Sequence, residues 1–349
     1  MKSIAIVGTV GIPACYGGFE SLVENLTLNS SENIQYTVFC SEKNYETKKE
    51  YHNKAKLEYI KLSANGIQSV FYDIISMIKC LSIKPDVVLI LGVSGCLFLP
   101  IFKLFSKSKV VTNIDGLEWK RDKWGKLPSL ILKWSENMAV RFSDVIVSDN
   151  QAISDYVFKE YSIKSQTIAY GGDHAIRNIH FEKNMNKYSL GLCRIEPENN
   201  VELILDAYSE LNEKLIFIGN WDSSDYGINL KEKYSHFKNI QLLNPIYDLD
   251  QLYVIRKGCS LYIHGHSAGG TNPSLVEMMH FGVPIVSYDC NFNRFSTSNC
   301  AHYFSNKDEL KKIVSDPNCD YKKNADKMKE IALRKYTWRN ITNEYERLY

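Results

Sequence analysis

The stretch His264-Gly-His-Ser-Ala-Gly-Gly-Thr-Asn-Pro-Ser-Leu-Val-Glu277 indicates the fold of this chain, because it leads from a buried strand through a glycine-rich loop into a helix. Asn272 is the expected N-cap of that helix, Pro273 its first residue and Gly282 its stop. Another apolar strand is expected at residues 284–288. The order strand, loop, helix, strand is typical of an α/β protein.

The loop itself has the properties of a phosphate-binding loop. Several backbone N–H groups and the positive end of the helix dipole face one spot there. Gly269 and Gly270 place no side chain in the way of a ligand. We therefore expect a phosphate group to bind at the start of this helix.

Strand and helix patterns alternate on both sides of this stretch, which predicts two doubly wound parallel sheets facing a central cleft. Helical patterns cover residues 67–81, 128–141 and 201–211. The expected strands cover residues 3–8, 36–40, 57–62, 87–91, 109–113, 145–148, 188–192, 215–219, 240–243, 261–264 and 284–288.

A polar stretch without periodicity marks the expected domain boundary. We predict an N-terminal Rossmann-like domain at residues 1–170, a linker at 171–187 and a C-terminal Rossmann-like domain at 188–330. The closing segment, 331–349, carries an apolar helical stripe and is expected to pack back on the N-terminal domain.

Composition narrows the class of protein. A net charge of +2 over 349 residues argues against a general nucleic-acid binder. Nine scattered cysteines without a Cys-x-x-Cys pair favour neither a disulfide framework nor a zinc site. The uncharged run at 87–102 is shorter than the roughly 20 residues of a spanning helix. No secretory signal is visible, so a cytoplasmic protein is expected.

The first glycine loop, at residues 9–20, follows the first strand and contains Gly17 and Gly18. Its spacing differs from the dinucleotide fingerprint, which argues against a nicotinamide dehydrogenase.

Taken together, the motifs resemble the retaining GT-B glycosyltransferases of family four, over essentially the whole chain. The resemblance is carried by the two-domain pattern and by a set of matching positions: Gly17-Gly18, Arg194, the loop and helix ending in Glu277, and Tyr336-Thr-Trp-Arg-Asn-Ile341 with Tyr345. A narrower resemblance, to the bacterial polysaccharide branch that includes β-1,4-rhamnosyltransferases, rests on Gly171-Gly-Asp173, residues 194–200, residues 113–121 and Gly269-Gly-Thr-Asn-Pro-Ser274.

The resemblance implies roles for these positions. Glu277 would hold the ribose hydroxyls of a nucleotide sugar, and Arg194 would face the charge that grows on the leaving nucleoside diphosphate. Gly17 and Gly18 would let the backbone close on the phosphates and sugar. Further donor contacts are expected from Tyr247 to the base, from His264, His266 and Gly270, and from the backbone at Thr271, Asn272, Pro273, Ser274 and Leu275.

Two positions depart from the family pattern. Asn199 stands where relatives commonly carry a Lys, and Gly269 stands where they commonly carry a Glu that contacts the donor sugar. A deoxysugar donor fits the missing carboxylate, which favours L-rhamnose supplied as dTDP-rhamnose.

Three features have two interpretations each. Asp115 follows a strand and either contacts the acceptor hydroxyl in catalysis or caps a turn. His264 and His266 either contact the donor or are structural, and they lack a third ligand for a metal. The segment after residue 117, which is rich in tryptophan and basic residues, either meets the acceptor and a membrane surface or packs inside the domain. Its residues are Glu118, Trp119, Lys120, Arg121, Lys123 and Trp124, with Lys103, Lys107 and Lys109 extending the same face.

The expected function is transfer of a sugar from a nucleotide diphosphate donor to a polyprenyl-diphosphate-linked oligosaccharide in bacterial O-antigen or capsule synthesis. The resemblance implies a retaining mechanism without a metal or other cofactor. The protein would act at the inner face of the plasma membrane and bind no nucleic acid. The alternatives are a hexosyl or N-acetylhexosaminyl transferase on the same fold, and a nucleotide-sugar-binding protein without turnover.

Overall fold

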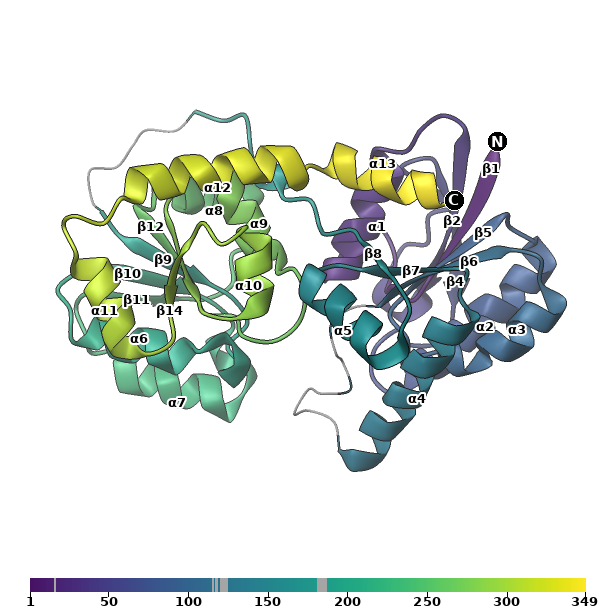
Figure 1. Cartoon of the computed structure of the whole chain (residues 1–349), viewed down its shortest axis with the longest axis horizontal. Helices are drawn as coiled ribbons and strands as arrows, with labels where there is room; N and C mark the ends of the chain where they lie inside the picture. Colours follow the sequence, from purple (N-terminus) through teal and green to yellow (C-terminus); the bar gives the residue numbers. More distant parts are fainter. Residues whose placement is uncertain (16, 115, 117–118, 120–124, 181–186) are drawn as a thin grey trace. The chain divides into compact units, whose positions relative to one another are not determined.

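The computed structural model describes residues 1–15, 17–114, 116, 119, 125–180 and 187–349. The chain forms two compact units, coloured along the sequence in Figure 1. Unit 1 comprises Met1–Ala169 together with Trp338–Tyr349, and unit 2 comprises Tyr170–Thr337. The polypeptide therefore leaves unit 1 once and returns to it with its last helix.

Unit 1 is built on an eight-stranded sheet in the order β3-β4-β2-β1-β5-β6-β7-β8. All pairs are parallel except β3 with β4. Its strands are β1 (Lys2–Val7), β2 (Ile34–Ser41), β3 (Tyr51–His52), β4 (Ala55–Ile60), β5 (Val87–Leu91), β6 (Lys109–Ile114), β7 (Val145–Ser148) and β8 (Gln166–Thr167). Central strands such as β5 are apolar at every position because helices cover both faces of the sheet.

The helices of unit 1 lie on the two faces of this sheet. Helices α1 (Gly18–Leu28) and α13 (Trp338–Leu348) cover one face, and α2 (Gln68–Ile83), α3 (Leu99–Phe105) and α4 (Lys126–Phe142) cover the other (Figure 1). Helix α5 (Gln151–Tyr161) connects β7 with β8.

The last helix is held in unit 1 by specific contacts. Helix α13 packs on α1, and the Tyr345 hydroxyl accepts a hydrogen bond from Asn113 Nδ2 at 2.7 Å. The Tyr36 and Tyr349 hydroxyls lie 3.1 Å apart. The expected segment 331–349 is split: residues up to Lys335 end α12 in unit 2, and α13 begins only at Trp338.

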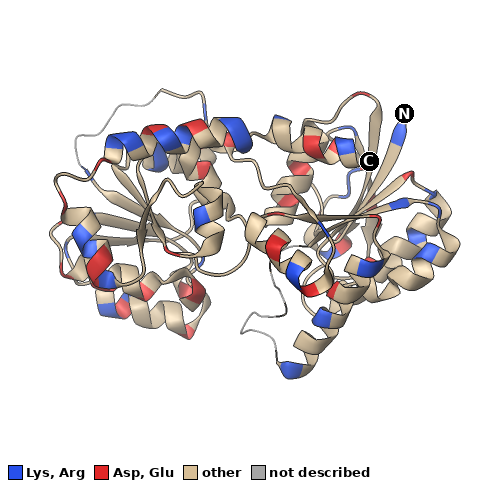
Figure 2. Ribbon diagram, in the orientation of Figure 1, with Lys and Arg blue, Asp and Glu red and all other residues tan. Residues whose placement is uncertain are grey.

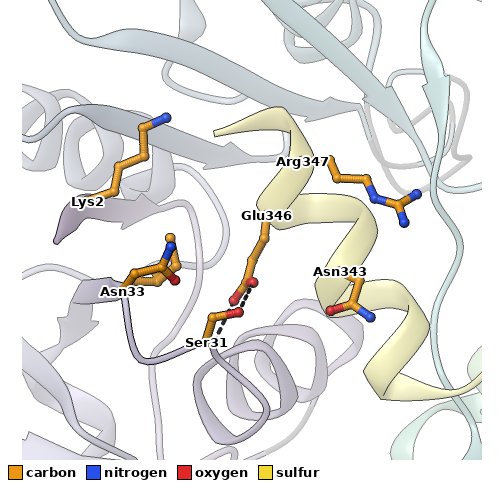
Figure 3. A pocket seen from close by; sticks show the side chains of 7 residues that line it. Lys2, Ser31, Asn33, Asn343, Glu346 and Arg347 are labelled. Atoms are coloured by element: carbon orange, nitrogen blue, oxygen red, sulfur yellow. Dashed lines mark hydrogen bonds between the residues drawn. The ribbon is translucent and has the colours of Figure 1, made fainter.

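Figure 3 shows a pocket of about 510 Å³ beside α13, in which Glu346 reaches Ser31. The Ser31 N–H donates to Glu346 Oε1 at 2.8 Å. Lys2 and Ile34, at the amino ends of β1 and β2, also line the pocket. Ligands of open α/β sheets bind at the opposite, carboxyl ends of the strands, so we interpret this pocket as a structural gap under α13.

Unit 2 is built on a six-stranded parallel sheet in the order β11-β10-β9-β12-β13-β14. Its strands are β9 (Ser189–Leu192), β10 (Leu215–Ile218), β11 (Ile240–Leu243), β12 (Leu261–His264), β13 (Ile285–Tyr288) and β14 (His302–Phe304). Its helices are α6 (Val201–Ser209), α7 (Asp225–Tyr234), α8 (Leu249–Gly258), α9 (Pro273–His280), α10 (Asn291–Ser296), α11 (Lys307–Ser315) and α12 (Tyr321–Lys335).

The predicted α/β fold with two doubly wound, Rossmann-like sheets is confirmed, and every strand named from the sequence has a counterpart. The pattern missed β3, β8 and β14, which lie at the sheet edges. These strands span two or three residues, too few for an alternation of apolar and polar side chains to be visible.

Candidate functional site

The loop between β12 and α9 has the local structure that its sequence predicts. Asn272 caps α9, and its side-chain oxygen accepts a hydrogen bond from the Ser274 N–H at 3.0 Å. Pro273 is the first helical residue, where its missing N–H costs nothing. Gly282 follows the helix with φ +63°, so it ends α9 in the left-handed region that favours glycine.

The amide groups at this helix start are partly engaged. The Leu275 N–H donates to the Asn272 carbonyl at 3.1 Å, and the Ser274 N–H is taken by the cap. A phosphate at this site would compete with the Asn272 side chain for the Ser274 N–H, and the helix dipole would still favour the anion.

Asn199, one of the two departures from the family pattern, is hydrogen-bonded to the Arg194 carbonyl and to His266. Asn199 Nδ2 donates to the Arg194 carbonyl at 2.7 Å, so the Asn199 side-chain oxygen is left as an acceptor. That oxygen lies 2.7 Å from His266 Nδ1, which must therefore carry a proton. A Lys at position 199 could not accept this bond.

Gly269 completes the same arrangement. Its φ of +109° is in a region that L side chains rarely adopt, and an added Cβ would lie 3.2 Å from His266 Nε2. The His266 ring thus borders the space that a Glu side chain at position 269 would need. Asn199 and Gly269 thus both lie next to the His266 ring.

The Glu277 side chain lies in unit 2 between Arg256 and His174. Its side chain is 13% exposed; Oε2 is paired with Arg256 Nη2 from α8, and Oε1 lies 3.3 Å from His174 Nε2. Burial by itself raises the pKa of Glu277, but the charges and hydrogen bonds of Arg256 and His174 outweigh it, so the pKa is below its ordinary value. The carboxylate is held ionised at a fixed position.

Arg256 and His174 were missed by the sequence analysis. Arg256 is 7% exposed and lies in the last turn of α8. A basic residue is common there because it interacts favourably with the negative end of the helix dipole. His174 lies in a short 3-10 turn, η4 (Asp173–Ala175), far from Glu277 in sequence. No spacing rule could have joined these positions.

The segment before His174 packs closely on α9. An added Cβ on Gly172 would lie 2.7 Å from the Glu277 backbone nitrogen, so glycine is required for this approach. The Gly172 N–H donates to the Tyr336 carbonyl at 2.8 Å, and His280 Nε2 lies 2.9 Å from the same oxygen. Three of the sequence motifs, around Gly172, Glu277 and Tyr336, therefore meet in unit 2.

His264 is a core residue. It is 2% exposed, its Nδ1 lies 3.4 Å from the Tyr262 hydroxyl, and its Nε2 has no hydrogen-bond partner among the described residues. Burial, with a smaller contribution from His266, lowers the pKa of His264 well below its ordinary value, so the ring is neutral. Within the described ranges no group of three or more His, Cys, Asp or Glu side chains is arranged to hold a metal ion.

Arg194 and Tyr247 are accessible to a ligand. Arg194 follows β9, and its Nη2 lies 3.5 Å from Glu196 and 3.8 Å from Glu198. Tyr247 is 78% exposed in the segment between β11 and α8. Both belong to unit 2, as do the remaining predicted donor contacts Gly270 and Thr271.

In unit 1 the glycine loop is organised by Glu20, which the sequence analysis did not single out. Glu20 Oε1 accepts hydrogen bonds from the Val10 N–H at 2.7 Å and the Thr9 hydroxyl at 3.0 Å. Gly17, the N-cap of α1, has φ +134°, and an added Cβ would lie 2.0 Å from Glu20 Oε2. Gly17 is therefore required by its backbone and by this close approach, and Gly18 begins the helix.

Most of the predicted acceptor or membrane residues, Asp115, Glu118, Lys120, Arg121, Lys123 and Trp124, lie outside the described part of the chain. Trp119 is described, and its Nε1 donates to Glu136 Oε2 at 3.1 Å. Lys133 Nζ lies 4.8 Å from the centre of the Trp119 ring. Trp119 is thus partly buried and packs against α4 of unit 1.

Comparisons with known proteins agree with this geometry. Residues 173–345 match the family model for glycosyl transferases group 1, and residues 1–173 match a domain of unknown function, DUF1972. No curated protein matches the sequence.

Solved structures match over the whole chain. Sucrose-phosphate synthase from Thermosynechococcus elongatus has a TM-score of 0.82 at 12% identity, covering 100% of this chain and 98% of that chain. Anabaena Alr3699/HepE in complex with UDP-glucose has a TM-score of 0.71 at 14% identity, covering 99% and 98%. Trehalose-6-phosphate synthase OtsA has a TM-score of 0.74 at 10% identity, covering 100% and 99%. Residues 173–345 thus match the glycosyl transferases group 1 family model, and the chain has the GT-B fold.

Proposed function

We propose that the protein is a retaining, metal-independent glycosyltransferase that moves L-rhamnose from dTDP-rhamnose to a polyprenyl-diphosphate-linked oligosaccharide, on the inner face of the plasma membrane, in bacterial O-antigen or capsule synthesis. The observation that carries the proposal is Glu277. It is a buried carboxylate, kept ionised by Arg256 and His174 and located in α9 after a glycine loop.

The chemistry of each group suits a nucleotide sugar. Two carboxylate oxygens of Glu277 can accept hydrogen bonds from the vicinal hydroxyls of a ribose. The start of α9 and the charge of Arg194 would attract the diphosphate. As the sugar leaves, negative charge grows on the diphosphate, and fixed positive groups stabilise that charge. In the proposal the departing phosphate takes the proton of the acceptor hydroxyl.

The choice of rhamnose rests on Asn199, His266 and Gly269. Gly269 offers no carboxylate for a sugar hydroxyl, and the His266 ring borders the space where that carboxylate would lie. A 6-deoxy sugar has one hydroxyl fewer that needs a hydrogen-bond partner, so it loses less binding free energy than a hexose at such a site.

A second candidate is a hexosyl or N-acetylhexosaminyl transferase. It is favoured by the similarity to Anabaena HepE, whose structure contains UDP-glucose. A third candidate is a nucleotide-sugar-binding protein without turnover. It is motivated by Asn199 and Gly269, the two positions that depart from the family pattern.

The test uses the full chain with dTDP-rhamnose, UDP-glucose, UDP-N-acetylglucosamine and GDP-mannose. The true donor raises the melting temperature, because a ligand that binds only the folded state stabilises it by RT ln(1 + [L]/Kd). Stabilisation by UDP-glucose alone selects the hexosyl candidate. Binding without hydrolysis or transfer of any sugar selects the non-catalytic one.

Glu277→Gln tests the role of the carboxylate with little change in shape. We expect nucleotide affinity in calorimetry to fall about ten- to hundredfold, the effect of losing hydrogen bonds to a charged group. Glu330→Gln on α12, an exposed carboxylate, is the matched control and leaves affinity unchanged. Unchanged affinity in Glu277→Gln would remove the basis of the proposal.

A further inference from the structure

The outer face of unit 1, formed by α2, α3 and α4, exposes large apolar side chains. On α4 the side chains of Leu127, Leu130 and Trp134 are 68%, 53% and 63% exposed and recur at i, i+3 and i+7. The opposite side of α4 packs inward through Ser135, Glu136, Ala139 and Val140. A helix on the surface of a globular domain normally turns its polar side outward, and the first half of α4 does the reverse.

The neighbouring helices continue the apolar surface. On α2, Phe71, Ile75 and Ile78 recur at i, i+4 and i+7 and are exposed. On α3, Leu104 and Phe105 are exposed by more than two thirds, at 79% and 74%. Helix α3 packs on both α2 and α4, so the three patches belong to one surface, which we call the α2–α4 face.

The exposed charges of the α2–α4 face are mostly basic, and the exposed Asp144 that follows α4 is paired with Lys103 of α3 at 2.8 Å. The acidic residues within these three helices are Asp73 and Glu136, and they are 2% and 1% exposed. Lys107, Lys126 and Arg141, in contrast, are exposed. Figure 2 shows the basic segments along α3 and α4. Apolar and basic side chains therefore reach solvent together there.

We propose that the α2–α4 face docks unit 1 on the surface of an anionic phospholipid bilayer. Exposed Trp, Phe and Leu side chains enter the boundary between headgroups and acyl chains, and Lys and Arg meet the lipid phosphates. No helix in the described part of the chain is long and apolar enough to cross a membrane. This docking rests on the proposed function in one respect, because a polyprenyl-linked acceptor lies in that bilayer.

The structure changes which residues carry this role. The sequence pattern pointed to the segment around Trp119, but the Trp119 ring is partly buried and donates to the buried Glu136 of α4. Helix α2 also contributes to the exposed apolar surface. Its apolar stripe did not predict a membrane contact, because the same periodicity fits a helix that faces the core.

The test is flotation of the full chain with vesicles of phosphatidylethanolamine and phosphatidylglycerol, and with vesicles of phosphatidylcholine alone. We expect the parent protein to float with the anionic vesicles, and to float much less with the neutral ones or in high salt. The variant Leu104→Ser/Phe105→Ser/Leu127→Ser/Trp134→Ser should bind the anionic vesicles at least about tenfold less. If the parent protein does not float with the anionic vesicles, the proposed docking is wrong.

The matched control is Leu249→Ser/Leu333→Ser, which removes apolar side chains of unit 2 that are 60% and 55% exposed. It should float like the parent. Equal flotation of the four-residue variant and the parent contradicts the inference. A second outcome also contradicts the inference: the parent binds no vesicles and sediments as a dimer, and the four-residue variant sediments as a monomer. The α2–α4 face would then join two copies of the chain.

Nucleotide binding separates this inference from the proposed function. The four-residue variant should keep the parent's affinity for its nucleotide sugar in calorimetry, since all four changes lie in unit 1 helices distant in sequence from the α9 loop. Vesicle binding by a protein that binds no nucleotide sugar would leave the docking standing and remove the proposed function.

Discussion

Glu277 on α9 of unit 2 and Asp73 on α2 of unit 1 are carboxyl groups with different surroundings. In unit 2, Glu277 is paired with Arg256 and His174, so a full negative charge is kept inside the protein. In unit 1, Asp73 is hydrogen-bonded by the hydroxyl of Ser94, and burial raises its pKa to about 7. Glu277 is thus held ionised, whereas the surroundings of Asp73 favour its neutral form.

Their surfaces differ in a related way. Helix α12 of unit 2 carries both signs, with Lys327 and Glu330 paired at 2.8 Å, as on an ordinary solvated helix. Helices α2, α3 and α4 of unit 1 expose apolar and basic side chains, and the exposed Asp144 after α4 is paired with Lys103. The surface of α12 is thus mixed in charge, whereas α2, α3 and α4 expose apolar and basic side chains.

The largest expected effect comes from Arg256→Met. Removing one partner of a buried ion pair leaves an uncompensated charge on Glu277, and we expect the free energy of unfolding to fall by about 3–5 kcal/mol. Asp73→Asn in unit 1 should cost about 1 kcal/mol, since neutral donors already face that group. Urea unfolding of both variants measures the contrast.

The double variant Arg256→Met/Glu277→Gln serves as the control. It should recover most of the lost stability, because no buried charge is left unpaired, while nucleotide binding stays weak. If Arg256→Met is no less stable than Asp73→Asn, the contrast between the two units is wrong.

A smaller effect is expected for Gly269→Ala. Strain at φ +109° and the contact with His266 should together cost about 1–3 kcal/mol. Gly66→Ala in unit 1 is the matched control: its φ is +69° and an added Cβ meets nothing within 4 Å, so strain acts alone and costs about 1–2 kcal/mol.

His266→Ala in the Gly269→Ala background separates the two contributions. If the His266 ring limits the space at position 269, removing it should recover part of the lost stability in urea unfolding. Equal costs for Gly269→Ala and Gly66→Ala would show that the ring does not restrict the glycine loop.

The smallest effect is a pH dependence of opposite sign in the two units. The pKa of His264 is lower in the folded state, so the unfolded chain binds more protons, and stability falls as the pH drops below the ordinary His value of about 6.5. One such proton changes stability by about 1.4 kcal/mol per pH unit. His280 and His302 act with the same sign, because burial lowers their pKa too.

Asp73 acts the other way. Its folded pKa of about 7 is above the ordinary value near 4, so its contribution is present at low pH and is lost as the pH rises through 7. Urea unfolding at pH 5 to 7 should therefore show a shallower pH dependence in His264→Gln than in the parent, and a steeper one in Asp73→Asn. A common slope in all three proteins would contradict both assignments.

Much of the fold was predictable because its signals are local. Buried parallel strands are short apolar runs, and the start of α9 is fixed by Asn272 and Pro273 within a few residues of each other. The glycine loops were recognisable for the same reason, since a positive φ is a property of one residue. The candidate site was predictable as far as Glu277 and its loop.

What the sequence determined by itself is most of the strands, the capped helix and the residues with chemistry suited to a nucleotide sugar. Only the tertiary structure decided which residues meet: Arg256 and His174 at Glu277, and Asn199 at His266. It also decided that the apolar stripe of α4 faces outward, because a periodic pattern defines a side of a helix but not what covers that side. Contacts between distant residues depend on how the sheets order their strands, and no local pattern contains that order.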